Sequence, residues 1–463
     1  MSIIGAVGRW IMSLFKQTAE KEFEVKQSTA TTMDSLIAYC ARAYAGEPDW
    51  TDKEDGIKTI NFAKLICSEI ARLATLAIGI QIDGSPRAEW LQKVIDDTTY
   101  FQLRHWLEYG CAYGTVILKP AGETVAMYTP EDFIVTENTN EHITGAVFID
   151  HAAEDGKFYT RLEHHRFEGE IYRVTNRCYV STAKDHPGKA IAIGQTPWSD
   201  INPDVAIEGL KTPLFAVLRM PEANSVELNS PLGLPVFYGA ITELKDLDIA
   251  YSRNAQEIAD SARTVLLDND ILMPSGYSMA KQLEMSDRLK MPRYVKTVQG
   301  NGHDEVYHEI NPTLNTETRI EGINNLLSHI GLKCGFSNGY FVLNEKTGMV
   351  TATQVEADDR RTIQMIKDVR DKLENCMDDL LYALNAFADL YGYAPAGEYE
   401  VTYDFGDITY NREEDRMRWW QYVQTNKVPA WMYFVKFEGM SEEDAKAMTA
   451  EAEPETPTLF GEE

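Results

Sequence analysis

The sequence predicts an α+β fold made of several modules, and three observations support this. Short β-rich runs separated by turn residues fill residues 111–182. Apolar residues recur at helical spacing over two unusually long stretches, 235–267 and 351–391. The chain has 463 residues, of which 44% are apolar, so it can bury real hydrophobic cores. A chain of this length is expected to form roughly two to four modules.

The first part of the chain predicts helices. The N-terminus, MSIIGAVGRWIMSLFKQ, is apolar, but Arg9 interrupts it and it is too short to span a membrane. We interpret it as an amphipathic arm that packs on this or a neighbouring subunit, with binding to a membrane surface as the lesser alternative. Helices are expected over 53–79 and about 86–108, the second with Phe101 in its apolar set. The short strand IQID and the turn GSP separate them.

A change in pattern after residue 110 predicts an antiparallel meander. The β-rich runs are GTVILKP, VAMYTP, DFIVTEN, TGAVFID, FYTRLEHHRF and EIYRVTNRCYV. The run LFAVLRMP at 214–221 is expected to return to the same sheet, after a loop over 184–212. Because neighbours on a strand face opposite sides of a sheet, His164 and His165 would chelate one metal poorly. We interpret them as surface or packing histidines.

Two further helices are expected to flank a small module. The stretch 235–267 carries one apolar stripe and predicts a single helix of 33 residues, roughly 50 Å long. Pro235 suits its first turn. Six Pro and Gly residues then break the chain over 271–312, where RYVKTV and DEVYHEI are β-like. Another helix is predicted over 315–333.

An irregular segment precedes the longest predicted helix. Residues 338–350 show no clear period, and glycines there and just before them favour flexibility. Two overlapping capping boxes begin at Thr351 and Thr353, and an apolar stripe continues to Tyr391. This predicts a helix of 41 residues, roughly 60 Å long. An amphipathic rod of that length needs another rod or a large body to cover its stripe.

The C-terminal part is acidic. Residues 393–463 hold 16 acidic and 6 basic residues, a net charge of −10. The runs REEDRMRWWQYVQ and SEEDAKAMTAE predict short helices, and the tail EPETPTLFGEE has the composition of a disordered segment.

Composition and motifs restrict the possible functions. The net charge is −28, the opposite of what a protein that wraps nucleic acid tightly usually carries, so any DNA contact must be local or transient. The six cysteines include no C-x-x-C pair and predict reduced, mostly buried thiols. The phosphate-loop, metalloprotease and nucleophile-elbow motifs are missing from the sequence, and acidic pairs such as Asp358–Asp359 predict solvated helix faces. The sequence gives no positive reason to expect an enzyme, a cofactor or a metal site.

The order of these parts resembles the portal proteins of long-tailed, siphophage-type bacteriophages over roughly residues 50–450. The resemblance lies in SPLGLPVFYGAITELKDLDIAYSRNAQEIADSARTVLL, in TATQVEADDRR with the long helix after it, and in YDFGDITYNREEDRMRWWQYV. It implies a head-to-tail connector: a ring, usually of twelve subunits, at one capsid vertex. Double-stranded DNA would be packaged through this ring by a terminase and later ejected through it.

The resemblance also implies a role for each part by its position. These parts are an N-terminal arm (1–52), a wing of helices and β-meander (53–233), a stem helix (234–270), a clip (271–312), a second stem helix (313–337), a tunnel loop (338–350), a long spine helix of the wing (351–392), a helical crown (393–450) and a disordered acidic tail (451–463).

Two sets of site residues follow from this assignment. The tunnel loop would project into the bore, and its DNA-contacting residues would be Asn338, Tyr340, Phe341, Asn344, Lys346 and Thr347. Lys346 is the only base in NGYFVLNEKTGMV, so it is the side chain expected to meet phosphate. Tyr340 and Phe341 are expected to wedge against neighbouring loops or the stem helix. In the clip, residues 281–296 carry a net charge of +3, and we hypothesise that they dock an acidic partner. The basic residues are Lys281, Arg288, Lys290, Arg293 and Lys296.

The implied partners are further copies of the chain, double-stranded DNA, the terminase large subunit, a head-completion or adaptor protein, and capsid and scaffolding proteins, with no membrane. The implied location is the portal vertex of the virion, and the host cytoplasm during assembly. Two other classes stay open: a non-enzymatic oligomeric helical scaffold unrelated to DNA translocation, and an enzyme whose site is assembled from dispersed residues. A purified particle seen as a ring with a central hole would distinguish a portal protein from both the scaffold and the enzyme.

Overall fold

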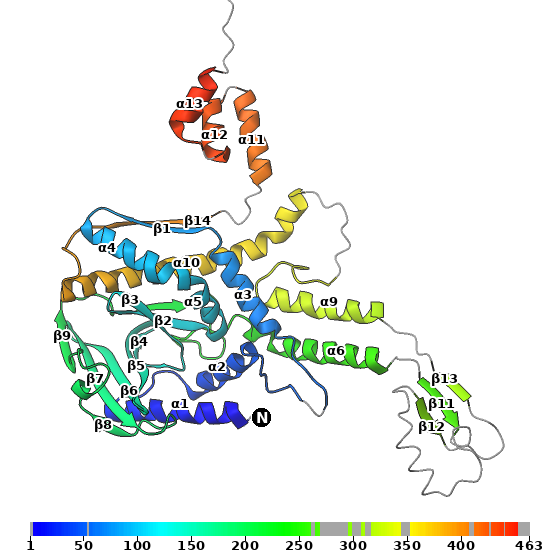
Figure 1. The fold of residues 1–463 in the computed structure, drawn as a ribbon, viewed down its shortest axis with the longest axis horizontal. Coiled ribbons are helices and arrows are strands. Elements are labelled where there is room, and N and C mark those ends of the chain that lie inside the picture. Colours follow the sequence, from blue (N-terminus) through cyan, green and yellow to red (C-terminus); the bar gives the residue numbers. More distant parts are fainter. Residues whose placement is uncertain are drawn as a thin grey trace, which may run out of the picture. The chain divides into compact units, whose positions relative to one another are not determined.

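The computed structural model describes residues 3–52, 55–260, 264–268, 295–298, 307–310, 316–343, 352–406, 412–425, 427–438 and 440–451. The chain divides into two units. One comprises Met1–Thr75 and Ile80–Tyr403, and the other Leu76–Gly79 and Asp404–Glu463. Helices and antiparallel sheets are largely segregated along the chain, so the predicted α+β class is confirmed (Figure 1).

A six-stranded antiparallel sheet forms the base of the first unit. Its strands are β4 (Phe133–Thr139), β5 (His142–Glu154), β6 (Lys157–Glu168), β7 (Ile171–Ser181), β8 (Lys189–Ile191) and β9 (Asp204–Glu208). Strands β4 to β8 follow one another in space, which confirms the later part of the predicted meander, whereas its first two runs form β2 and β3 of a separate sheet. The loop predicted over 184–212 is wrong in part, because β8 and β9 pair with two different stretches of β7. They cover backbone groups that a bare edge strand would expose.

A second sheet lies against the first. It contains β10 (Ala216–Arg219), β2 (Thr115–Ala121) and β3 (Thr124–Tyr128), in that order. The run at 214–221 is expected to return to the sheet of the β-rich runs, and its strand β10 does pair with one of them, β2. The core between the sheets includes Ile117, Phe148 and Phe215. Strand β2 is buried on both faces, which explains why its sequence is almost continuously apolar.

Helices cover both faces of this pair of sheets. Helix α1 (Ile3–Glu22) lies on the outer face of the six-stranded sheet, where Phe15 and Ala19 pack with Val147 and Leu162. Helix α2 (Thr31–Tyr44) contributes Met33 and Ile37 to the core between the two sheets. The N-terminal segment therefore packs on its own chain.

The paired histidines of β6 are buried on opposite faces, as predicted. His164 lies beside Phe23, with 4.9 Å between ring centroids, and His165 lies beside Phe148, at 5.3 Å. A guanidinium N–H of Arg166 donates to His164 Nδ1 at 3.1 Å, so the proton of this imidazole belongs on Nε2, which faces Thr136 Oγ1 at 3.4 Å. Burial, assisted by the charge of Arg166, lowers the pKa of His164 to about 4.

A buried ion network joins the two sheets. Lys119 of β2 pairs with Glu163 of β6, and Arg161 lies 3.2 Å from the same carboxylate and 2.8 Å from Asp150. Burial alone would raise the pKa of Glu163, but Lys119 and its other cationic neighbours hold that pKa well below its ordinary value. Each buried charge thus has a partner, which is the condition for tolerating charges in a core.

The helices before the sheets differ from prediction in detail. Instead of one helix over 53–79, the structure has α3 (Phe62–Ala74) and strand β1 (Ile78–Asp83). The side chain of Asn61 caps α3 by accepting from the Lys64 N–H, so the helix begins there. The predicted helix 86–108 is confirmed as α4 (Pro86–Val94) and α5 (Tyr100–Tyr113), joined by a π-helical turn.

The π-helical turn, Ile95–Thr99, changes the phase of the helix after it. Ile95 and Thr99 at its two ends are buried, as is Leu103 in α5. Phe101 was placed in the apolar set, but the structure leaves 75% of its surface exposed. The contradiction arises because a π turn has no sequence signature in the apolar spacing.

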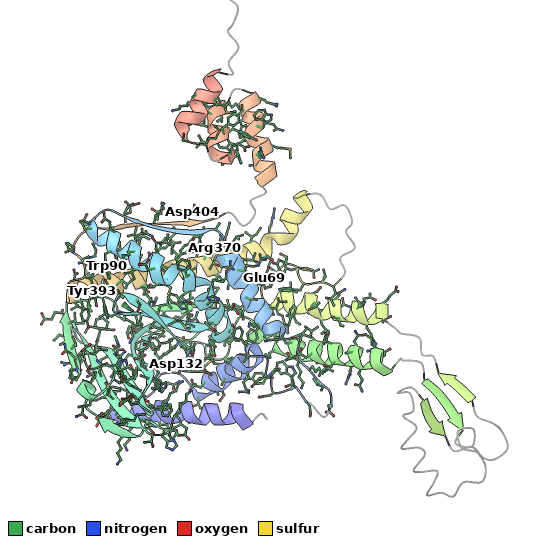
Figure 2. The ribbon with its side chains drawn as sticks, viewed as in Figure 1. Glu69, Trp90, Asp132, Arg370, Tyr393 and Asp404 are labelled. Carbon is green, nitrogen blue, oxygen red and sulfur yellow. The ribbon has the colours of Figure 1, made fainter. Side chains whose placement is uncertain are left out.

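The longest helix, α10 (Ala352–Tyr391), confirms the predicted rod. It packs against β10, β2, α3 and α4. Near its middle, Arg370 of α10 donates to the carbonyls of Ala74 (3.0 Å) and Leu73 (3.3 Å), which end α3 (Figure 2). These carbonyls lack partners within α3, so Arg370 supplies their hydrogen bonds.

Near the C-terminal end of α10 lies Arg87 of α4, whose side chain is only 1% exposed. Its guanidinium donates to the Asn385 side chain (2.6 Å), to Asp389 (2.6 Å) and to the carbonyls of Ala394 and Pro395 (2.8 and 3.1 Å). Nearby, the rings of Trp90 and Tyr393 stack at 5.6 Å (Figure 2). The arginine therefore satisfies the polar groups that the end of α10 leaves open.

The second unit is small and helical. It contains α11 (Arg412–Gln424), α12 (Ala430–Glu438) and α13 (Glu442–Glu451), of which α11 and α13 confirm the predicted short helices. Strand β14 (Glu400–Phe405) precedes them and pairs with β1. Arg416 donates to Tyr433 Oη at 2.7 Å and to Glu438 at 2.5 Å, and so joins α11 to α12. Of the predicted disordered tail over 451–463, Glu451 is the last residue of α13, and the rest lies outside the described residues.

Replacing Arg87 with Met should strongly destabilise the protein. Methionine fills similar space but leaves the carbonyl groups of Ala394 and Pro395 without donors, each at a cost of about 1–3 kcal/mol. We expect the free energy of unfolding, measured by urea denaturation, to fall by about 3 kcal/mol. The control is Arg72→Met, whose side chain is 51% exposed and should change stability by less than about 1 kcal/mol. Equal effects of the two substitutions would contradict this role for Arg87.

Acid should destabilise the protein partly through His164. Its pKa is about 4 in the folded chain and about 6.5 in an unfolded one, so below pH 6.5 the unfolded state binds more protons. The stability that neutral His164 provides is complete above pH 6.5 and is lost as pH falls through about 4. His164→Gln should flatten urea-measured stability over this window, whereas His186→Gln, at an exposed position, should not. An unchanged pH slope in the first variant would refute the assignment.

Candidate nucleic-acid interface

Two antiparallel helices lead away from the sheets and back. They are α6 (Ile241–Asp260) and α9 (Thr316–Lys333), and ion pairs join them at both ends: Lys333 with Glu243 at 2.5 Å, and Arg319 with Glu257. The base of α6 is fixed to the body by Asp248, whose buried carboxylate accepts from the Trp50 indole at 2.8 Å and the Ile60 N–H at 3.0 Å. The predicted helix 315–333 is confirmed.

The helix predicted over 235–267 is too long at both ends. The carbonyl of Pro235 accepts from the Tyr238 N–H at 2.9 Å in a turn, and α6 begins only at Ile241. At the other end, Thr264–Asp268 forms strand β11. The apolar residues of β11 fit the period of a helix as well as that of a strand. This segment forms a strand because it pairs with β12 (Val295–Val298) and β13 (Tyr307–Ile310).

Strands β11, β12 and β13 form one three-stranded sheet. Only three residues separate α6 from β11, and five separate β13 from α9. Because α6 and α9 are antiparallel, their connected ends lie at the same end of the helix pair. The sheet is therefore tethered by two short segments to that end, and two of its strands confirm the β-like runs predicted for the clip.

A sharp turn follows α9. Gly335 has φ +88°, and hydrogen bonds from Phe336 N–H to the Gly331 carbonyl (2.9 Å) and from Gly335 N–H to the Leu332 carbonyl (3.4 Å) form a Schellman motif. A Cβ at position 335 would also lie 2.7 Å from Met365 Cγ. Gly335 therefore ends a helix against α10, rather than supplying freedom to a loop.

The first residues of the predicted tunnel loop are fixed to the helices around them. The Ser337 N–H donates to Thr362 Oγ1 of α10 at 2.8 Å, and both residues are buried. Four aromatic rings pack nearby: Phe341 lies 4.8 Å from Phe336 and 5.0 Å from Phe62 of α3, and Tyr340 lies 4.8 Å from Phe336.

A hydrogen bond to α3 adds to this anchor. The Tyr340 hydroxyl donates to Glu69 of α3, which is also paired with Arg72 at 2.6 Å. Hydrogen bonding from Arg72 lowers the pKa of Glu69, while burial and this carboxylate raise the pKa of Tyr340. A charged acceptor makes the hydrogen bond from the phenol a strong one.

A last pair of hydrogen bonds fixes Leu343. Its N–H donates to Asn324 Oδ1 at 2.7 Å, and the Asn324 amide donates back to the Leu343 carbonyl at 3.0 Å. Asn324 belongs to α9, so the segment from Ser337 to Leu343 is held by α3, α9 and α10 together. The sequence offered no signal for this role of Asn324.

The predicted site residues divide into three groups. Asn338 is exposed, whereas Tyr340 and Phe341 are half-buried in the aromatic cluster, as expected for residues that wedge against a helix. Asn344, Lys346 and Thr347 lie outside the described residues, as do Lys281, Arg288, Lys290 and Arg293. Lys296 lies on β12, opposite Leu266 of β11.

The structure adds two basic residues that sequence reasoning missed. Arg360 and Lys367 are both exposed on the part of α10 that follows the loop. They are seven residues apart and so share one helix face. The sequence contains this spacing, but acidic and basic residues are mixed along the helix, so the two basic residues do not form a distinct pattern.

The described residues contain neither a metal-binding cluster nor a membrane-spanning helix. No group of three or more His, Cys, Asp or Glu side chains there could hold a metal ion. No helix among the described residues has the length and apolar character to cross a membrane. All six cysteines are buried free thiols, as predicted.

Comparisons with known proteins find a likeness among solved structures, but none among family models or curated sequences. No protein-family model matches the sequence, and no curated protein sequence matches it. A solved structure described as "Neck of native GTA particle computed with C12 symmetry" aligns over 89% of this chain and 95% of that chain. The sequence identity is 11% and the TM-score is 0.43. A likeness at this level does not assign a function.

Removing the Asn324 side chain should free the end of the anchored segment. Asn324→Ala deletes both hydrogen bonds to Leu343, so we expect the Leu343 amide to exchange hydrogen at least about tenfold faster, which corresponds to about 1.4 kcal/mol. The measurement is amide hydrogen exchange followed by mass spectrometry. Asn325→Ala, at an exposed neighbouring position, is the matched control. Unchanged exchange at Leu343 would show that Asn324 is no anchor.

Proposed function

We propose that this chain is a portal protein, twelve copies of which form a ring at one capsid vertex. Double-stranded DNA passes through the ring during packaging and ejection. The observation that carries the proposal is the path of the chain through α6, the β11–β13 sheet, α9, the anchored segment and α10. A helix pair with a small sheet at its far end and a long helix returning over the body suits a ring wall with a projecting stem and clip.

Exposed apolar side chains support assembly into a ring. On α6, Tyr251 is 47% and Ile258 53% exposed, and on α9, Leu332 is 39% exposed. Phe101 of α5 adds an aromatic ring with 75% of its surface in solvent. Exposed large apolar residues on this helix pair are candidates for contacts that a second subunit covers.

The anchored segment supports a role for the residues after it. With Ser337 to Leu343 held by three helices, DNA contact falls to the side chains that follow, among them Asn344, Lys346 and Thr347. One lysine per subunit makes a weak, salt-sensitive phosphate contact, which suits DNA that must slide. The strongly acidic remainder of the chain disfavours tight wrapping. In this scheme residues 271–312 dock the terminase during packaging and a head-completion protein afterwards.

A single experiment tests the ring and the loop. Native mass spectrometry and electron microscopy of the purified chain should show closed rings with a central hole. Replacing 344–348 with Gly and Ser residues should leave the rings intact, because the helices and anchors are untouched, yet reduce DNA filling or retention in assembled capsids. The control is the same replacement in the surface turn 184–188.

The two parts of the proposal fail separately. Monomers or dimers at every salt and protein concentration would refute the ring. Rings whose loop variant packages and retains full-length DNA would leave the ring standing and make residues 344–348 a mere connector.

A further inference from the structure

Four aromatic rings form a continuous array at the C-terminal end of α10. The ring centroid of Phe387 lies 5.4 Å from that of Tyr391, which lies 5.7 Å from that of Tyr393. Tyr393 in turn lies 5.6 Å from Trp90 of α4, and these two rings are side by side (Figure 2). The planes of successive rings are inclined by 34°, 21° and 13°, so the rings are close to parallel.

The array is only partly covered by the rest of the chain. Tyr391 is 60% and Tyr393 36% exposed, and Leu390, the residue before Tyr391, is 46% exposed. Parallel rings in contact are about 3.5–4 Å apart, so centroids more than 5 Å apart belong to offset rings that overlap only in part. Part of the aromatic faces is therefore open to solvent. The neighbouring rings already fix one another, so a partner that covers them costs little side-chain entropy.

Carboxylates border the array. Glu123 is exposed and accepts a hydrogen bond from the Trp90 indole N–H at 3.3 Å. Asp389 lies two residues before Tyr391, and its side chain is 57% exposed. Glu89, the residue before Trp90, is exposed as well. A ligand that contacts the rings therefore meets three carboxylates at their edge.

Cations near the array are fewer and less accessible. The stretches that carry the rings, 86–94 and 385–393, contain two cations, Arg87 and Lys93. Arg87 is 1% exposed and already donates to Asp389 and to two backbone carbonyls, so it is not available to a ligand. Lys93 is exposed and follows Trp90 by three residues on the same face of α4. Three accessible carboxylates thus outnumber one accessible amine.

Aromatic faces bordered by carboxylates favour a cationic ligand, and a guanidinium more than an ammonium. A guanidinium is planar, so it stacks on aromatic rings, and its fork of N–H groups fits a carboxylate. Single-stranded nucleic acid also stacks its bases on aromatic rings, but such sites carry cations for the phosphates. The acidic border of this array repels phosphates instead.

We propose that the array is a docking site for a basic segment of a partner protein, which stacks an arginine side chain on the rings and pairs it with Glu123 or Asp389. Charge favours a different protein over a second copy, because this chain has 72 acidic and 44 basic residues and a net charge of −28. The inference concerns a single subunit and stands or falls independently of the proposed ring.

Binding of a synthetic peptide tests the inference. The probe is a fluorescein-labelled peptide of alternating Gly and Arg residues, and fluorescence anisotropy gives its dissociation constant. The salt concentration is about 0.15 M, which screens long-range attraction to an acidic chain. Tyr391→Ala removes an exposed ring without a change of charge and should raise the dissociation constant at least about fivefold. Tyr391→Phe keeps the ring and should bind like the wild type.

Matched controls separate the site from general attraction. Tyr109→Ala removes a tyrosine of α5 that is 37% exposed and should leave binding unchanged. Glu123→Gln should weaken binding at least about threefold, whereas Glu154→Gln, at an exposed position away from the rings, should not. A peptide of alternating Gly and Lys residues should bind more weakly than the arginine peptide.

Each outcome supports or overturns the inference. It is wrong if the arginine peptide does not bind the wild type, or if Tyr391→Ala and Tyr109→Ala bind it equally well. An oligothymidine strand that binds through Tyr391, where the peptide does not, would assign the array to single-stranded nucleic acid. Circular dichroism reports the fold of each variant. If Tyr391→Ala does not fold, the comparison of Glu123→Gln with Glu154→Gln decides.

Discussion

The apolar stripe of α10 is the constraint on which the first unit depends. A helix of 40 residues cannot keep such a stripe in water, so several other elements pack against it. Strands β2 and β10 cover one part, and α3 and α4 cover others. Arg370 and Arg87 then fix the helix lengthwise, because each satisfies backbone carbonyls at the end of a helix. The same rod follows the proposed DNA-contacting loop in the chain.

The segment Ser337–Leu343, which precedes α10 in the chain, is also fixed in place. The Schellman turn at Gly335, the Ser337–Thr362 contact and the Asn324–Leu343 pair hold the segment on three helices. A loop that extends into a channel would need such an anchor, since force on its tip would otherwise unravel the end of α9. The aromatic residues Tyr340 and Phe341 belong to this anchor, and duplex DNA offers no free base face on which they could stack.

Charge is managed differently inside and outside the chain. The chain is strongly acidic, yet buried cations occupy key positions, among them Arg87 at the end of α10, Lys119 between the sheets and Arg219 of β10. Each has a nearby carboxylate partner, which offsets the cost of removing a cation from water.

The sequence by itself determined the elements whose signals are local. The rod over 352–391, the helix over 316–333 and the meander strands followed from periodicity, capping boxes and turn residues, because these act through neighbours in the chain. The shortening of the helix at 235–267, the pairing of β10 with β2, the π turn that exposes Phe101 and the anchor of Leu343 on Asn324 depended on the tertiary structure. Each results from contacts between residues far apart in the sequence, where packing and hydrogen-bond partners outweigh local preference.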